Sequence, residues 1–130
     1  MDAVTIKFCA DSFRALSMKD LGLILDGLVA ARDGLVSVLN QPRCTGEAED
    51  ELDDTVDAVH DAIDLLASIA NEATPIEPDE VKARAWLLLG YHARLRDDLP
   101  QLAALATSLA ADLSKANFAQ THREKRNGDA

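Results

Sequence analysis

The chain has 130 residues, which suffices for one domain with a single core. With 48% hydrophobic and 28% charged residues, the composition is typical of a globular protein and excludes a chain that is disordered throughout. The net charge of −10 opposes binding to nucleic acid or to an anionic membrane, because phosphate contacts need clustered Lys and Arg. We therefore expect basic or cationic partners.

The core is expected to be aliphatic, because aromatic residues make up only 4% of the chain. Since the chain is rich in good helix formers, the expected fold class is all-α. The N-terminal residues lack the pattern of a signal peptide, and Asp26 interrupts the longest apolar run. We expect no membrane span. Cys9 and Cys44 have neither metal-binding nor redox spacing. Two free thiols in a reducing cytoplasm are the corresponding expectation.

Residues 1–16 predict a short N-terminal arm, since residues 4–8 alternate apolar and polar side chains as an extended segment does. Three interpretations remain open for this arm. It is free, or it pairs with a second copy of the chain, or Phe8, Phe13 and Leu16 pack a loose lead-in against the helices.

Residues 17–117 predict an antiparallel four-helix bundle, and the polar residues 118–130 predict a disordered tail. Ser17 and Asp98 stand where N-caps are expected, and Pro78 opens a helix. The predicted helices span residues 17–40, 47–73, 78–96 and 98–116.

The first predicted helix contains Gly27, Ala31 and Gly34 close together on one face. Small residues in this arrangement allow another helix to approach the backbone closely. The alternative is that the two glycines merely weaken the helix, at about 1 kcal/mol each.

The second predicted helix carries the acidic excess of the chain. Residues 45–73 hold ten carboxylates and no Lys or Arg, whereas the other residues carry 13 acidic and 13 basic side chains. Apolar residues with coiled-coil spacing form the inner seam of this helix. Opposite that seam, two columns of aspartates are predicted to bind a basic partner: Asp50, Asp54, Asp57, Asp61 and Asp64. The alternative is a solvated face that only confers solubility.

The third predicted helix is apolar nearly all round for two turns. Besides its inner seam, it carries Trp86, Leu87 and Leu89 on other sides. Such a helix is buried from several directions, either as the central helix of the fold or by a second subunit. We predict self-association through these three residues, giving a homodimer.

Two histidines suggest alternative functions. His92 occupies a seam position, where it is either a core histidine or the phosphoacceptor of a histidine phosphotransfer domain; His60 is the less favoured acceptor. Asp57 and His60 have the spacing of half a di-metal site, and inward-facing carboxylates from two helices would make the chain a cation-binding bundle.

Four capped helices with a Pro-x-x-Pro-Asp-Glu entry to the third, at residues 75–80, make the chain resemble small all-α bacterial proteins of unassigned function. This resemblance implies no activity. Since the sequence has no catalytic or cofactor motif, we expect a non-enzymatic interaction module without a metal or cofactor. It would bind a basic partner as a chaperone, adaptor or inhibitor does.

Overall fold

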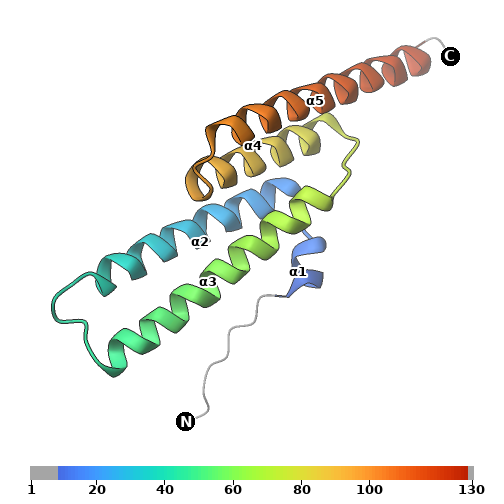
Figure 1. Ribbon diagram of the computed structural model, residues 1–130. Coiled ribbons are helices and arrows are strands. Elements are labelled where there is room, and N and C mark those ends of the chain that lie inside the picture. The colour runs from blue at the N-terminus through green and yellow to red at the C-terminus, as the bar shows by residue number, and fades with distance from the viewer. Residues whose placement is uncertain (1–8, 129–130) are drawn as a thin grey trace.

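The computed structural model describes residues 9–128 and contains only helices in that range (Figure 1). The all-helical class predicted from the sequence is therefore confirmed for these residues. A short helix precedes four long ones: α1 (Ala10–Arg14), α2 (Met18–Leu39), α3 (Glu47–Glu72), α4 (Pro78–Leu95) and α5 (Leu99–Gly128).

Helix starts follow the capping residues of the sequence. The Ser17 hydroxyl accepts a hydrogen bond of 3.1 Å from the Asp20 amide at the start of α2. Asp98 accepts one of 3.1 Å from the Gln101 amide at the start of α5. Pro78 lies in the first turn of α4, where its missing N–H has no intrahelical partner to lose. The predicted ends of the first three long helices hold to within one residue.

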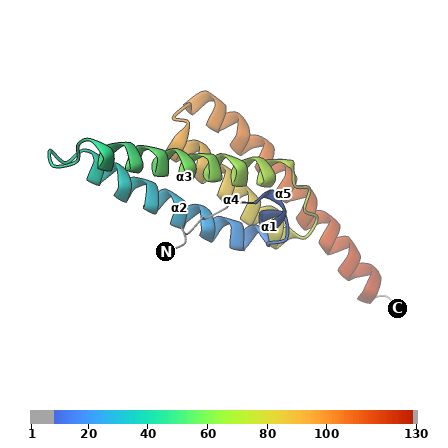
Figure 2. The same ribbon diagram turned by 90° about the horizontal axis from the view of Figure 1, so that it is seen from below.

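Two helical hairpins make up the fold. Helices α2 and α3 form the first hairpin, and α4 and α5 form the second (Figures 1 and 2). Helix α4 packs against α2, α3 and α5, whereas α5 packs extensively only against α4. Completely buried Leu and Ile side chains fill the centre: Leu21, Leu25, Ile63, Leu66 and Leu88. One of the two alternatives for the third predicted helix is thus confirmed, because α4 is the central helix.

The arrangement is more open than a closed bundle, because α5 packs extensively only against α4, and the predicted antiparallel four-helix bundle stays a prediction. Seen from below, α5 runs obliquely to α3 (Figure 2). The α2–α3 loop and the C-terminal end of α5 project at opposite ends of the molecule (Figures 1 and 2). No residue of α3 before Val59, and none of α5 after Ala116, is buried. Both projecting ends therefore expose their helices on several sides.

Arg84 of α4 ties three helices together. Its Nε donates a 2.7 Å hydrogen bond to the Ala70 carbonyl, and a terminal nitrogen donates one of 2.8 Å to the Asn71 carbonyl. These carbonyls lie in the last turn of α3, where no further helical N–H follows to bind them. Arg84 also approaches Asp112 of α5, at 3.9 Å.

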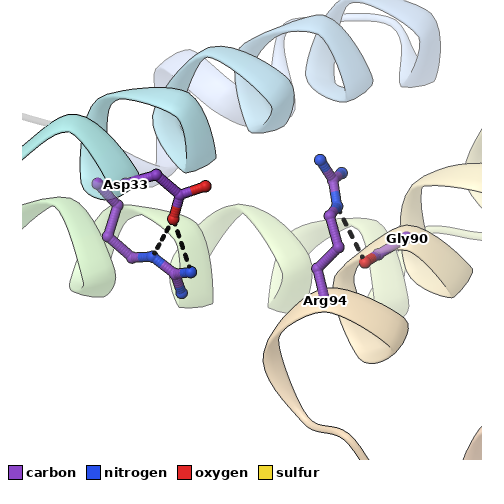
Figure 3. A network of polar contacts seen from close by, with 4 residues as sticks. Asp33, Gly90 and Arg94 are labelled. Atoms are coloured by element: carbon purple, nitrogen blue, oxygen red, sulfur yellow. Dashed lines mark hydrogen bonds and ion pairs between the residues drawn. The ribbon is translucent and has the colours of Figure 1, made fainter. Parts of the chain in front are cut away.

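Two further contacts fix α2 against α4. The Met18 amide donates a 3.0 Å hydrogen bond to the Glu80 carboxylate, so each helix start lies beside the other. Arg94 folds back along α4, with its Nε toward the Gly90 carbonyl (Figure 3), and a terminal nitrogen lies 3.0 Å from Asp26. Figure 3 also shows Asp33 on α2, which accepts both hydrogen bonds of the neighbouring Arg32. That arginine stays on α2, so Arg94 is the one that connects the two helices here.

The predicted extended arm is wrong for residues 10–14, which form α1. Phe13 is buried and Leu16 packs against the core, which confirms the third interpretation of this segment for those two residues. The alternating residues 4–8 lie outside the described range.

The predicted disordered tail is also wrong for residues 118–128, because α5 continues to Gly128. Interactions one helical turn apart stabilise this end. The Thr121 hydroxyl donates to the Asn117 carbonyl, and the Phe118 and His122 rings meet edge to face. Arg123 forms a 3.2 Å ion pair with Glu77 before α4. These contacts do not require apolar residues at regular helical spacing. The sequence therefore lacks the apolar pattern from which the other helices were predicted.

Among the described helices, none is both long and apolar enough to cross a membrane.

Gly27 and Gly34 are not sites of close helix approach, since a Cβ at either position would meet no atom within 4 Å. The alternative interpretation applies: they only weaken α2.

We expect Gly27→Ala and Gly34→Ala each to raise the free energy of unfolding by about 0.5–1 kcal/mol in urea titrations. Gly46→Ala is the control, because Gly46 has a φ of 65°. That substitution should destabilise the protein by about 1 kcal/mol. Loss of stability on Gly27→Ala would contradict this interpretation of α2.

Candidate functional site

The five predicted partner-binding aspartates, here called the acidic face, are all exposed on α3: Asp50, Asp54, Asp57, Asp61 and Asp64. None of them forms an ion pair among the described residues. Asp50 lies in the first turn of α3, where the helix dipole favours a negative charge. Asp54, Asp57 and Asp61 lack that local compensation, so their mutual repulsion is relieved only by solvent, ions or a partner.

Much of the acidic face lies on the projecting part of α3. Core burial on this helix begins at Val59, while Leu52 and Val56 are only half-buried. The segment from Glu47 to Asp57 therefore extends past the region where α3 packs into the core. A partner could reach its aspartates without displacing any part of the described chain.

Asp64 differs from the other four aspartates because a second helix holds it. The Tyr91 hydroxyl of α4 donates a 2.7 Å hydrogen bond to its carboxylate. The structure thus places one predicted site residue against a side chain that the sequence analysis left unassigned. Asp64 also lines a groove, and this contact fixes one of the groove's walls.

The groove lies between α3, α4 and α5 and has a volume of about 610 Å³. It exists because α5 packs along α4 without closing onto α3. Ala67, Leu88, Ala104 and Leu105 supply apolar surface, and Leu88 and Ala67 belong to the buried core. Cavities of this size and mixed lining are typical of binding sites.

Polar side chains from all three helices converge on the same groove. Arg96, directly after α4, lies over the Tyr91 ring, with its guanidinium carbon 5.7 Å from the ring centroid. Hydrogen bonding to Tyr91 raises the pKa of Arg96, and the charge of Asp64 raises it further. Ser68 and Asn71 of α3 and Gln101 of α5 complete the polar lining. The groove therefore has one anionic and one cationic group, both placed by a single tyrosine.

His92 lines this groove, and its ring meets that of Tyr91 edge to face, with centroids 5.2 Å apart. The side chain is half-buried, and its Nδ1 is a buried polar atom with no hydrogen-bond partner among the described residues. An unpaired buried nitrogen is unusual, since such atoms normally find a partner in protein, water or ligand. His60 is also half-buried. Because His92 and His60 are only half-buried, neither is wholly enclosed, and histidine phosphotransfer through either residue stays a prediction.

The cation-binding hypothesis requires carboxylates that face inward from two helices. The acidic face points outward, and the described residues contain no group of three or more His, Cys, Asp or Glu side chains that could hold a metal ion. Asp57 and His60 therefore have no additional ligands beside them in the described residues.

The predicted self-association residues separate in the structure. Trp86 is 68% exposed, but Leu87 is buried and Leu89 packs against the core. Leu87 was therefore wrongly assigned to an external surface, because it is buried within the chain itself, whereas the assignment of the half-buried Leu89 stays a prediction. Leu23 of α2, which was not among the predicted residues, is 62% exposed and lines the same surface hollow as Trp86. Leu23 and Trp86 together are called the α2–α4 apolar patch.

The groove could not be predicted from the sequence either. Tyr91 and Arg96 carry no recognisable spacing, and their role depends on the position of α5, which heptad patterns do not specify. A buried tyrosine needs a hydroxyl partner, and this was the one available signal.

Comparison with protein-family models, with curated proteins and with solved structures finds no match to this chain.

Tyr91 offers a direct test of this geometry because the chain has a single tyrosine. Burial raises the pKa of the Tyr91 hydroxyl above 10.0, and the hydrogen bond to Asp64 raises it further. The folded state therefore binds this proton more tightly than the unfolded state does. The resulting stabilisation is complete below pH 10 and is lost as the pH rises through the folded-state pKa.

We expect the absorbance of tyrosinate to titrate above 10.0 in the native protein and near 10.0 in urea. Asp64→Asn should lower the native midpoint only partly, since burial is the larger cause. A native midpoint at or below 10.0 would show that Tyr91 does not occupy this environment.

Proposed function

We propose that the chain is a non-enzymatic interaction module that presents the acidic face of α3 to a basic protein partner. The observation that carries this proposal is that five exposed aspartates on one helix have no ion-pair partner among the described residues. Retaining unpaired like charges costs stability, and a partner with Lys or Arg side chains would offset that cost.

In this proposal the four long helices act as one antiparallel bundle with α5 at its edge. Its role is that of a chaperone, adaptor or inhibitor, because an exposed charged helix binds and steers partners without needing a reaction centre. The free cysteines Cys9 and Cys44 suit a cytoplasmic location. The net charge of −10 argues against nucleic-acid and membrane partners.

The acidic face can be tested by affinity capture from the native host. The test variant replaces Asp50, Asp54, Asp57 and Asp61 by Asn and spares Asp64, which holds Tyr91. The matched control neutralises four exposed acids elsewhere: Asp33, Asp79, Asp97 and Glu124. Wild type and control should retain the same basic protein, which the test variant loses. Binding should weaken as salt is added, since exposed charges are screened. Equal retention by all three proteins would refute the proposal.

We also propose that the chain forms a homodimer through the α2–α4 apolar patch. An exposed tryptophan beside an exposed leucine is typical of an interface, because scattered single apolar residues are common but contiguous ones are not. The patch adjoins a hollow of about 240 Å³ whose lining includes Gly22, so the surface offers a projection and a recess side by side. Such a surface can pair with its own copy.

Light scattering should show a dimer for the wild type and a shift toward monomer for Trp86→Ala. A central tryptophan contributes about 2 kcal/mol or more, which weakens association by about 30-fold. Phe118→Ala is the matched control, since Phe118 is 66% exposed but lies on α5, outside the patch. A wild type that remains monomeric at high concentration would contradict the proposed dimer.

A further inference from the structure

The groove and the acidic face share one helix, and Asp64 belongs to both. The groove-lining side of α3 is formed by Asp64, Ala67, Ser68 and Asn71. Toward its N-terminus the same helix leaves the core and carries most of its carboxylates. The surface that lines the groove therefore continues along α3 into an acidic, solvent-exposed strip.

The aspartates of α3 are not equivalent with respect to this strip. At a helical rotation of about 100° per residue, Asp53 and Asp57 lie within about 30° of the centre of the groove-lining side. By the same measure Asp61 and Asp54 lie about 70° and about 90° away from it. All four are exposed. Asp53 and Asp57 are thus aligned with the groove, and Asp54 and Asp61 are not.

The groove itself has an apolar interior and an unsatisfied polar atom. The buried Leu88 belongs to its lining, and beside it Ala104 is exposed and Leu105 is half-buried. The buried Nδ1 of His92 lacks a partner among the described residues. An apolar side chain that enters here removes apolar surface from water, at about 25 cal/mol per Å². A polar group next to that apolar side chain, or a water molecule, can form a hydrogen bond with the Nδ1 of His92.

We infer that the groove and the aligned aspartates form one docking site for a basic amphipathic helix, which inserts apolar side chains into the groove and places Lys or Arg along Asp53 and Asp57. This inference rests on the proposed function and specifies the partner's chemistry. The aspartates favour a partner helix with Lys or Arg side chains, by charge complementarity. The groove favours apolar side chains at one end of that helix. From Asp53 to Asp64 the strip is about 16 Å long, which corresponds to about three helical turns.

The probe for this site is a fluorescein-labelled synthetic helix of about 16 residues, long enough to span the strip. Leu residues at i, i+3 and i+4 occupy one end, and Lys residues continue the same face. It is made in both orders, with the Leu cluster at either terminus. A companion peptide has Ser in place of Leu. Fluorescence anisotropy gives the affinity for full-length protein variants, whose folding is checked by circular dichroism.

Two pairs of variants separate this site from diffuse charge attraction. Asp53→Asn/Asp57→Asn and Asp54→Asn/Asp61→Asn remove equal charge from the same helix. We expect the first pair to weaken binding at least about tenfold more than the second, because only its carboxylates face the Lys side chains directly. Ala104→Phe fills the groove and should weaken the Leu peptide about tenfold but leave the Ser peptide unchanged. Ala103→Phe, on an exposed neighbouring position outside the groove, should change neither.

If Ala104→Phe disturbs α5, Ser68→Phe obstructs the groove from the opposite wall and carries the same expectation. Equal losses from the two aspartate pairs, with no effect of either Phe variant, would overturn the docking site and leave the acidic-face proposal standing. If neither pair of Asp→Asn substitutions changes the affinity for the peptide, both proposals are overturned. Failure of the wild type to bind either order of the Leu peptide would overturn the docking site.

Discussion

The structure depends on the burial of α4, a helix that is apolar on nearly all sides. It packs against α2, α3 and α5, and no other long helix in the described residues packs extensively against all three of the others. Leu87 and Leu88 are buried in these contacts, while Arg84 binds the last carbonyls of α3. Because α5 is attached mainly through α4, the placement of α4 also decides where α5 lies.

The two exposed features of the molecule follow from this placement. Helix α5 covers α4 but does not close onto α3, so a groove lined by Asp64, Tyr91 and Arg96 remains between them. The α2–α3 hairpin extends past the core, so the acidic part of α3 stays in solvent. One helix, α3, connects the two. The proposed docking site is thus a result of incomplete closure, and a tightly closed bundle would lack it.

Sequence patterns predicted the helices well because their signals are local. Ser17 and Asp98 specified helix starts, and the heptad spacing of α3 specified its buried seam. Patterns failed where the structure depends on long-range packing. Leu87 could not be told from a surface residue without the positions of α2, α3 and α5, and α5 beyond Phe118 has no apolar period. The acidic face was predictable from charge alone, but the pairing of Asp64 with Tyr91 was not.

We propose that the groove and the acidic strip bind one partner as a single surface. The most direct measurement is nuclear magnetic resonance of the labelled protein during titration with the Leu-anchored basic helix. Amide signals of residues 53–71 in α3 and of Gln101–Leu105 in α5 should shift together at one affinity, while those around Leu23 in α2, outside the groove, remain unchanged. Shifts confined to the exposed carboxylates before Val59, with the groove residues unmoved, would contradict the claim.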